Sequence, residues 1–549
     1  MRAMPKPVIC CLLALALLPG FLAGCRSGET RAERAAREKI LIIGNGTEPK
    51  TLDPHIASGV TEHHLITTLI EGLTSQHPSE ETVEPAAAER WESNEGLDEW
   101  TFHLRPTGKW SNGAPVTAHD FVFAYQRILT PKLGGQYAEM LYIMKGAEAF
   151  NKGETTDPST LGVRALDDLT LRISLVGPTP YFPLVLTHYT WFPVHPPTIL
   201  KYGSIDTRAS RWTHPGHYVG NGPFQLKTWN FKHLIEVERN PHYWDAANVK
   251  LNGIRFLPID NIPAEERMFR DGQLHKTEQM PLDKIDFWRT QRPENYMQHP
   301  YLGTYFYRIN TTHPHLKDSR VRRALTLAID RESIVKNITR AGQTAAKGFT
   351  PPMGDYAGLD VLKYDPEEAR RLLAEAGYAD TASFPRFDIM INVSESHRIL
   401  AEAIQQMWKQ NLGINVGINS QDWGVYLDSQ QRLEYDVCRA GWIADYTDPV
   451  VFLDMWTTGN GNNQTGWSNA EFDALIAKSR GIADTTERYK VLTQAEAILL
   501  KDMPVIPIYV YSRYYLISPM VKNWHPLLLD THPWKYIDVE PPPSAAAAR

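Results

Sequence analysis

Short segments of the chain alternate apolar and polar residues, the pattern of a half-buried β-strand. The clearest are TFHLR at 101–105, LTLRISL at 169–175 and IEVER at 235–239. KILIIGNG at 39–46 is instead a short continuous apolar run that ends in a glycine turn, which predicts a buried strand. Strands are therefore expected along the whole first half of the chain.

Other segments carry apolar residues every three to four positions, which predicts amphipathic helices. Thr117 is a candidate N-cap for a helix over 118–129, and Asp365 for one over 365–378 that ends near Gly377. We expect one continuous helix over 320–338 and a last helix over 486–501. Residues 26–38 are small and charged and predict a tether or a fraying helix.

The order of elements favours an α/β protein. A strand at 387–393, a helix at 400–414 and a segment at 415–423 form a β-α-β unit, which implies a parallel sheet with helices on its faces. The segment 505–517, VIPIYVYSRYYLI, predicts an aromatic-rich strand. Three prolines between 178 and 183 exclude a central strand there.

Length and charge narrow the class of protein. A chain of 549 residues exceeds the roughly 250–300 residues of a single core, so two or three lobes are expected. The net charge of −6 gives no electrostatic reason to bind nucleic acid.

The N-terminus is similar to a bacterial lipoprotein signal. Arg2 and Lys6 precede an apolar run that ends in LAGC at 22–25, which implies a signal peptide over 1–24 and lipid on Cys25. The alternative is an ordinary signal peptide cut elsewhere. No other apolar run approaches the ~20 residues of a membrane span. Cys438 is then the one cysteine left without lipid, so no disulfide can form within the mature chain.

The segment RAGWIADYTDP at 439–449 places charges among apolar residues. A buried charge is unfavourable unless it is paired. Asp445 therefore pairs with Arg439, caps a turn, or awaits a positive charge that the protein does not supply.

Signatures of enzymes are absent from the sequence. It contains no G-x-S-x-G and no H-E-x-x-H motif, and GNG at 44–46 lacks the rest of a dinucleotide fingerprint. His63–His64 and His313–Pro–His315 are the nearest to metal-binding clusters, and neither has a convincing set of further ligands. We expect no enzyme, no cofactor and no metal.

Several motifs occur together in one order. They are EPKTLDP (48–54), KWSNGAPVTAHDF (109–121), NGPFQLKTW (221–229), RVRRALTLAIDRESIV (320–335) and YDVCRAGWIADYTDPVVFL (435–453). Over about residues 40–540 the chain resembles the extracytoplasmic oligopeptide-binding proteins of ABC importers, solute-binding protein family 5. The resemblance implies a three-lobed periplasmic-binding-protein fold of type II, with a hinged ligand cleft and an inserted extra lobe.

The resemblance also implies lobe boundaries. Lobe I takes residues 26–70, 200–302 and 513–549, lobe II is the inserted 71–199, and lobe III is 303–512. The chain then crosses between lobes I and III near 301–310 and near 508–513, and these crossings are hinge candidates.

The family motif assigns roles to individual residues. Asp445 would pair with the α-ammonium group of a peptide, while Gly441 and Val60 would offer main chain to a peptide that runs as an added strand. Trp442 and Trp423 would form walls of side-chain pockets, although core packing is the alternative for both.

The other family positions are aromatic or cationic. Tyr137, Tyr301 and Tyr511 would line the cleft, and Arg439 and His397 would receive the ligand's carboxylate. There are departures. Gly303 and Ile443 stand where similar proteins carry cysteines that can pair, and Ser58 replaces an acidic residue.

The implied function is capture of short peptides and their delivery to the permease and ATPase subunits of an importer. The protein would be an extracytoplasmic monomer that meets the membrane only through lipid on Cys25. Within binding proteins the alternative ligand is a muropeptide or another amine-bearing compound. A ligand-sensing receptor and an extracytoplasmic hydrolase are the alternatives from other classes.

Overall fold

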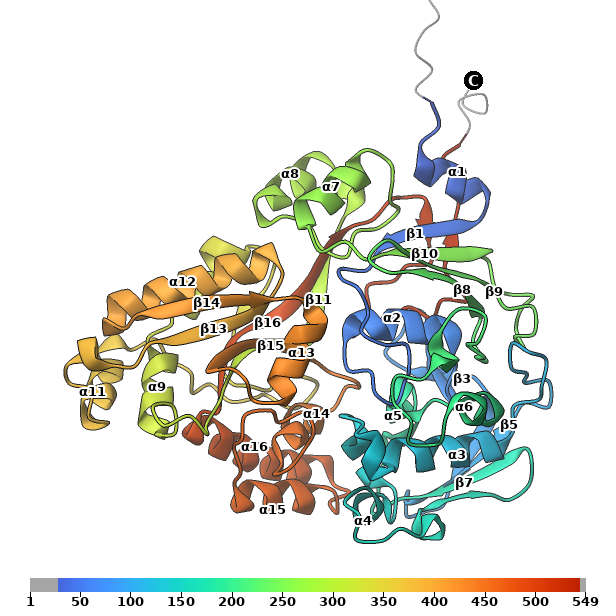
Figure 1. The fold of residues 1–549 in the computed structure, drawn as a ribbon, viewed down its shortest axis with the longest axis horizontal. Helices are drawn as coiled ribbons and strands as arrows, with labels where there is room; N and C mark the ends of the chain where they lie inside the picture. Colours follow the sequence, from blue (N-terminus) through green and yellow to red (C-terminus); the bar gives the residue numbers. More distant parts are fainter. Residues whose placement is uncertain (1–27, 544–549) are drawn as a thin grey trace, which may run out of the picture.

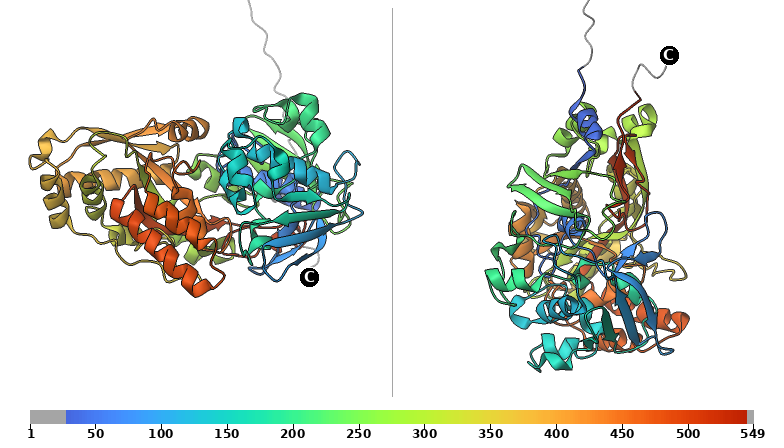
Figure 2. Two further views of the ribbon diagram at one scale, coloured as in Figure 1. Left: turned by 90° about the horizontal axis from the view of Figure 1, so that it is seen from below. Right: turned by 90° about the vertical axis from the view of Figure 1, so that its right-hand side faces the viewer.

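The computed structural model describes residues 28–543, and its strands form three larger sheets and two ribbons of two strands each. Elements of the third sheet lie on one side of the molecule, and those of the first two sheets lie on the other (Figure 1). The same two halves stand side by side when the molecule is seen from below (Figure 2). Within the described residues, no helix combines the length and apolar character that crossing a bilayer requires.

The first sheet has the strand order β1-β10-β9-β8 and joins segments far apart in sequence. Its strands are β1 (Ile40–Gly44), β8 (Phe224–Asn230), β9 (Leu234–Arg239) and β10 (Gly253–Leu257). Strand β1 is the predicted buried strand, and it pairs in parallel with β10.

Of the two alternatives for 26–38, a tether or a fraying helix, the described part of the segment favours a helix, and this helix is docked: α1 (Arg31–Arg37). Thr30 and Glu33 form a reciprocal capping box at its start, and its alanines at 32, 35 and 36 are buried. The small residues of this segment allow the helix to pack closely against β1 and the segment near Gly272.

The second sheet is antiparallel, in the order β4-β5-β7-β6. Its strands are β4 (Ala88–Ser93), β5 (Glu99–Leu104), β6 (Val163–Ala165) and β7 (Thr170–Ser174). Helix α3 (Ala118–Leu129) packs beside it, with the predicted N-cap Thr117 in a capping box with Asp120. The proline segment that follows β7 contains the short helix α5 (Phe182–Val185) and no strand.

The third sheet has six strands in the order β12-β16-β11-β15-β13-β14. Strands β13 (Phe387–Asn392) and β14 (Val416–Gln421) are parallel and joined by α12 (Glu395–Leu412), so the predicted β-α-β unit is confirmed. Strand β15 (Val437–Ile443) lies between β13 and β11.

Two long antiparallel strands, β11 (Tyr296–Ile309) and β16 (Val505–Leu516), run from the region of the first sheet into the third (Figure 1). Their pairing shifts register between Pro300 and Thr304. The predicted lobe boundaries at 302/303 and 512/513 fall inside these two strands. The division into three lobes with those boundaries stays a prediction.

The expected single helix over 320–338 is wrong. The structure has α9 (Ser319–Leu327), then α10 (Arg331–Ile334) and a π-helical turn over Val335–Thr339. The side chain of Asp330 accepts a hydrogen bond from the N–H of Ser333 and starts a second helix. The apolar stripe continues through both helices, so periodicity alone did not reveal the break.

Most remaining helix predictions are confirmed. Asp365 caps α11 (Pro366–Glu375), and Gly377 follows its end with a φ of +98°. The last helix is α16 (Thr485–Asp502). The other elements are α2 (Val60–Leu69), β2 (Thr74–Gln76), β3 (Val83–Pro85), α4 (Ala147–Asn151), α6 (Pro196–Tyr202), α7 (Ile262–Arg270), α8 (Ile285–Gln291), β12 (Thr344–Ala345), α13 (Trp423–Gln431), α14 (Val450–Leu453), α15 (Ala470–Ser479), β17 (Val521–Lys522) and β18 (Asp538–Val539).

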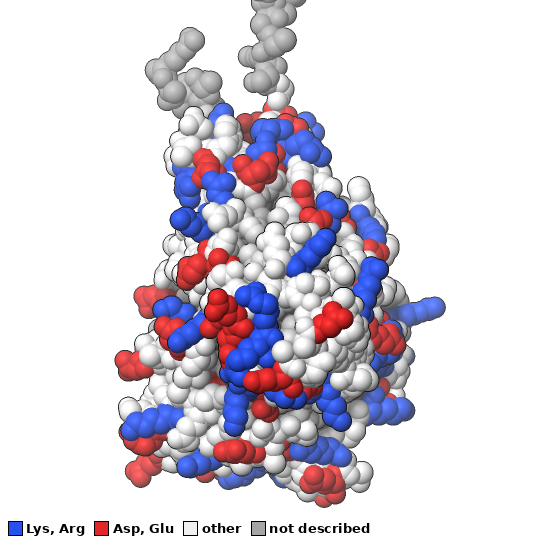
Figure 3. Space-filling view, turned by 90° about the vertical axis from the view of Figure 1, so that its left-hand side faces the viewer, with Lys and Arg blue, Asp and Glu red and all other residues white. Residues whose placement is uncertain are grey.

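The molecular surface carries mixed charges. On the face at the third-sheet end of the molecule, acidic and basic side chains are interspersed (Figure 3). Nucleic-acid binding uses a continuous basic surface, and this face offers none among the described residues.

Candidate ligand-binding site

A cleft of about 430 Å³ lies between the two halves of the molecule. It is lined by residues from α2, from the segment 187–192 that follows α5, and from the strands of the third sheet. All ten residues predicted to contact a ligand line it: Val60, Tyr137, Tyr301, His397, Trp423, Arg439, Gly441, Trp442, Asp445 and Tyr511. The sequence therefore selected residues that the fold brings together, while their individual roles stay predictions.

Asp445 follows β15, and its carboxylate is nearly buried, with 9 % of the side chain exposed. Its Oδ1 lies 3.1 Å from Nε2 of His188, a residue that sequence reasoning missed. Its Oδ2 is buried without a hydrogen-bond partner among the described residues. The N–H of Thr190 donates to Nδ1 of His188, at 3.4 Å. With Nδ1 accepting, Nε2 of His188 presents its hydrogen to Oδ1 of Asp445, and half of the carboxylate is left unsatisfied.

Arg439 does not pair with Asp445, so that alternative is wrong. The guanidinium donates to the hydroxyl of Tyr511 at 3.1 Å and lies 5.1 Å from the ring centre of Tyr305. Its Nε is buried and has no partner within residues 28–543. No carboxylate of the described chain lies within ion-pair distance of it. Arg439 is thus a cation with unused donor capacity, directed into the cleft.

His397 stands beside this cation. Its Nδ1 lies 3.4 Å from the hydroxyl of Tyr305. Burial, and then the charge of Arg439, hold the pKa of His397 well below its usual value, so the imidazole is neutral. It can donate or accept a hydrogen bond near a ligand's carboxylate but adds no charge of its own.

Strand β15 carries an edge that is open toward the cleft. It pairs with β11 along its whole length, from Val437 to Ile443. With β13 it pairs only at Val437 and Cys438. In the described structure, residues 439–443 therefore have no strand partner on that side. The carbonyl of Arg439 accepts from the side chains of Tyr426 and Gln430, so the outward backbone groups of residues 440–443 are the ones available to an extended chain.

Gly441 lies at the middle of this open edge. A Cβ at this position would lie 2.4 Å from the hydroxyl oxygen of Tyr511, so a larger residue requires the tyrosine to move. Glycine thus allows close approach of backbone and ring.

Aromatic rings form the walls of the cleft. Trp442 stacks on Tyr137 with centroids 5.7 Å apart, and Trp423 stacks on Tyr426 at 5.8 Å. Tyr301 and Tyr511 meet edge to face at 6.1 Å where β11 and β16 run side by side. Val60 is the first residue of α2, where backbone N–H groups have no partner within the helix.

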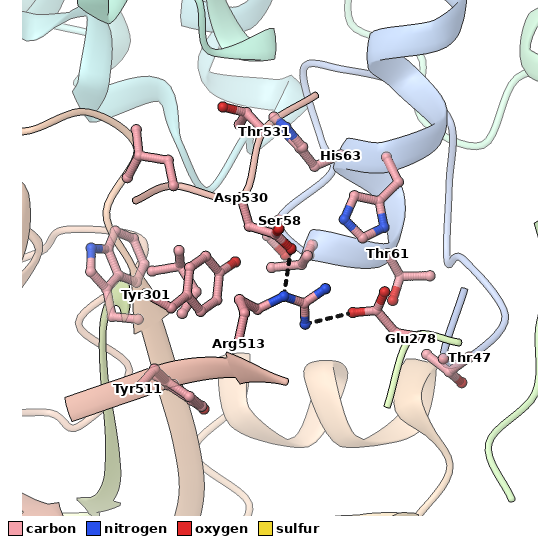
Figure 4. Close-up of a pocket in the computed structure, with 18 of the residues that line it drawn as sticks. Thr47, Ser58, Thr61, His63, Glu278, Tyr301, Tyr511, Arg513, Asp530 and Thr531 are labelled. Atoms are coloured by element: carbon pink, nitrogen blue, oxygen red, sulfur yellow. Dashed lines mark hydrogen bonds and ion pairs between the residues drawn. The ribbon is translucent and has the colours of Figure 1, made fainter. Parts of the chain in front are cut away.

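An ionic cluster that sequence reasoning missed lies at the first-sheet end of the cleft (Figure 4). Arg513 bridges Glu278, at 3.0 Å, and Asp530. Burial opposes ionisation of Glu278, but the charges of Arg513 and Lys276 outweigh it and lower the pKa to about 2. The three residues come from separate segments, so no sequence spacing could have indicated the cluster.

Contacts across the cleft hold its two sides together. Asn462 donates to Glu139 at 2.5 Å, and Tyr181 stacks on Tyr446 at 5.7 Å. Together with the pair of His188 and Asp445, these contacts describe a closed cleft.

Residues 82–464 match the model of the bacterial extracellular solute-binding proteins, family 5 Middle. The chain belongs to this family. Membership makes it a solute-binding protein rather than an enzyme, in agreement with the missing catalytic motifs. The mixed α/β fold expected from the resemblance is confirmed as well.

The alignments with named relatives cover nearly the whole chain. It is 38 % identical to the periplasmic oligopeptide-binding protein OppA of Salmonella typhimurium, covering 93 % of this chain and 95 % of the relative. The structure of Haemophilus influenzae OppA in complex with RPPGFSPFR matches with a TM-score of 0.87 at 34 % identity, covering 91 % and 99 % of the two chains.

A third relative bears on closure. One structure of the Escherichia coli murein tripeptide-binding protein MppA matches at TM-score 0.86, with 32 % identity over 91 % of this chain and 98 % of the other. Its unliganded open form matches only at 0.62, at the same identity over 92 % and 98 %. The solute-binding protein described here is therefore unlike the open form, as its cross-cleft contacts also indicate.

Two of the three departures from the family pattern, Gly303 and Ile443, lie side by side. Gly303 and Ile443 are direct partners in the pairing of β11 with β15. A Cβ at Gly303 would lie 2.4 Å from Cδ1 of Ile443, so the isoleucine fills the space beside the glycine. The remaining cysteine, Cys438, is free and buried. Cys25 and the predicted signal peptide lie outside the described residues.

Proposed function

We propose that this solute-binding protein captures short peptides in its cleft and delivers them to the permease and ATPase subunits of an ABC importer. The observation that carries the proposal is the open edge of β15, which has the half-satisfied carboxylate of Asp445 at one end and the unpaired guanidinium of Arg439 at the other. An edge with opposite charges at its ends is complementary to an extended peptide with a free amine and a free carboxylate.

The ligand would bind as an added strand. Its backbone N–H and C=O groups would pair with the outward backbone groups of residues 440–443, which requires no particular side chains. Asp445 would receive the ammonium group through Oδ2, and Arg439 would receive the carboxylate with help from His397. The aromatic walls would accept side chains of different sizes, and water would fill the space that small ones leave.

The distance between the two charges limits the length of the ligand. Residues 439 and 445 are six positions apart, and an extended chain of that length spans about 20 Å. The side chains of Arg439 and Asp445 each reach part of this distance, so peptides of about three to five residues fit best.

The named relatives support this ligand class. They are described as binding oligopeptides or a murein tripeptide, and one is seen with the peptide RPPGFSPFR. A murein peptide is the second candidate ligand, because MppA matches this chain almost as well as OppA does. Both candidates carry a free amine that Asp445 would bind.

The place of action follows from the N-terminal sequence. Cleavage before Cys25 and lipid on its sulfur would tether a monomeric binding protein outside the cytoplasmic membrane. Residues 26–30 would then connect the lipidated cysteine to α1.

The first test is mass spectrometry of the small molecules released when the protein, purified without added ligand, is denatured. A mixture of short peptides with free amines is expected. A single murein peptide would favour the second candidate, and a sugar or a metal complex would contradict the proposal.

The second test measures binding of Ala-Ala-Ala and its N-acetylated form by calorimetry. Acetylation removes the charge that Asp445 would bind, and we expect it to weaken binding by about 2–4 kcal/mol. Asp445→Asn should weaken binding of the free peptide and reduce the difference between the two peptides. Asp168→Asn is the matched control, because the side chain of Asp168 is 80 % exposed. Equal affinity of the wild type for both peptides would refute the role of Asp445.

A further inference from the structure

A cluster of metal-ligating side chains lies outside the cleft, at the end of the third sheet. His313 and His315 follow β11, and Asp436 directly precedes β15. One donor atom from each of the three lies within 4.8 Å of the other two. The sequence offered only the two histidines, and the fold supplies the carboxylate from a residue far along the chain.

The sheet holds the two segments in place. Ile309 pairs with Val437, and the N–H of Asn310 donates to the carbonyl of Asp436 at 2.9 Å. The side-chain amide of Asn310 donates to the carbonyls of Leu433 and Tyr435. The cluster therefore rests on a rigid frame, as a preformed binding site requires.

Hydrogen bonds satisfy two of the three candidate ligand residues and leave the ring nitrogen Nε2 of the third, His315, without a partner. His313 Nδ1 lies 2.7 Å from Oδ1 of Asp436, and Oδ2 of Asp436 accepts from the N–H of Asp388 at 3.2 Å. Nε2 of His315 lies 3.8 Å from Oδ1 of Asp436, too far for a hydrogen bond. This nitrogen is buried and has no partner in the described part of the chain.

The ring of His315 is fixed in this position. It meets Phe384 edge to face at 6.1 Å and lies 6.2 Å from Phe387. A buried ring nitrogen without a partner is unfavourable, so a group that binds it is expected.

We propose that His313, His315 and Asp436 bind a divalent transition-metal ion, of which Zn²⁺ is the one to test first. Two imidazoles and one carboxylate are ligands that zinc accepts, and water can take the fourth position. Two donors on one tetrahedral zinc ion lie about 3.4 Å apart. Nε2 of His315 and Oδ1 of Asp436 are 3.8 Å apart, which is close to this value. To surround one zinc ion, the three ligand atoms would have to shift by about 1 Å.

The ion would connect the loop after β11 to the start of β15. None of its three ligands lines the cleft, so metal binding and peptide binding are separate properties of the chain. Zinc should raise the temperature of unfolding without changing peptide affinity.

The test uses the full mature chain, prepared without a polyhistidine tag and freed of metal by dialysis against a chelator. Zn²⁺ is titrated in competition with a chromogenic indicator. One ion per chain is expected to bind, and His315→Ala and Asp436→Asn should each weaken binding at least tenfold. His233→Ala is the control, because His233 is an exposed histidine in the turn between β8 and β9.

Co²⁺ gives an independent readout, since its visible absorption is strong in a four-coordinate site and weak in aqueous solution. His313→Ala serves as a further variant in case the half-buried His315 cannot be replaced without unfolding, as circular dichroism would show. The proposal is overturned if the wild type and all three ligand variants bind Zn²⁺ equally, or if the wild type binds none.

Discussion

Single residues decide whether the cleft can receive a chain, and Gly441 is the clearest case. Gly441→Ala places a Cβ against the hydroxyl of Tyr511, which would push the ring toward the ligand's path. We expect weaker binding of Ala-Ala-Ala by about 1–3 kcal/mol. Gly424→Ala is the matched control, because a Cβ at Gly424 meets nothing within 4 Å.

Removing the hydroxyl tests the cause of that effect. In the double variant Gly441→Ala with Tyr511→Phe, the closest clash is gone, and part of the lost affinity should return relative to Tyr511→Phe alone. If the double variant loses as much as the sum of the single variants, the hydroxyl of Tyr511 is not the obstacle.

At the scale of single residues, the sequence indicated one residue of each interacting pair. Asp445 and Arg439 stand out because charges among apolar residues need partners. The partners themselves could not be read from the sequence. His188 approaches Asp445 from the other side of the cleft, and Asp436 approaches His313 through strand pairing. Contacts between distant segments depend on the fold, and no local pattern encodes them.

Among the elements, the open edge of β15 gives the sharpest prediction. Along an added strand, successive ligand N–H groups point alternately toward the edge and away from it. N-methylation of one amide at a time in a tetrapeptide should therefore weaken binding in alternation. A methylated amide that faces β15 should lose about 1–2 kcal/mol, and its neighbours little. Calorimetry of the series checks this, and equal losses at every position would argue against strand addition.

Elements with a regular pattern and a local start signal were predictable. The capping residues Thr117 and Asp365 start α3 and α11 as expected, and the β-α-β unit followed from its periodicity. The break at Asp330 was missed because a cap inside an apolar stripe competes with the stripe itself. The unpaired edge of β15 was also beyond the sequence, because strand pairing is not local.

At the scale of the whole molecule, the fold class could be predicted from motifs that occur in a fixed order. Closure of the cleft could not be predicted in this way. Closure depends on how surfaces of distant segments meet, as in the contact of Asn462 with Glu139. A peptide bound between the halves would add contacts to both, so it should stabilise the closed form and make the protein more compact. The groups that closure buries then link ligand binding to pH.

Glu139 gives this link a sign. Burial is the largest cause that raises the pKa of its carboxyl from 4.5 to about 8. The closed, folded state therefore holds the proton more tightly than the unfolded chain does. As pH rises from 4.5 toward 8, the stabilisation from this bound proton is lost, and the free energy of unfolding should fall by at most about 1.4 kcal/mol for each pH unit.

The variant Glu139→Gln tests this link, because it cannot ionise and can still accept the hydrogen bond from Asn462. With saturating peptide, its unfolding temperature should equal that of the wild type near pH 5 and exceed it near pH 8. Glu154→Gln, at an exposed position, is the control, and its unfolding temperature should equal that of the wild type at both pH values. If the difference in unfolding temperature between Glu139→Gln and the wild type does not grow with pH, Glu139 is already ionised in the closed protein.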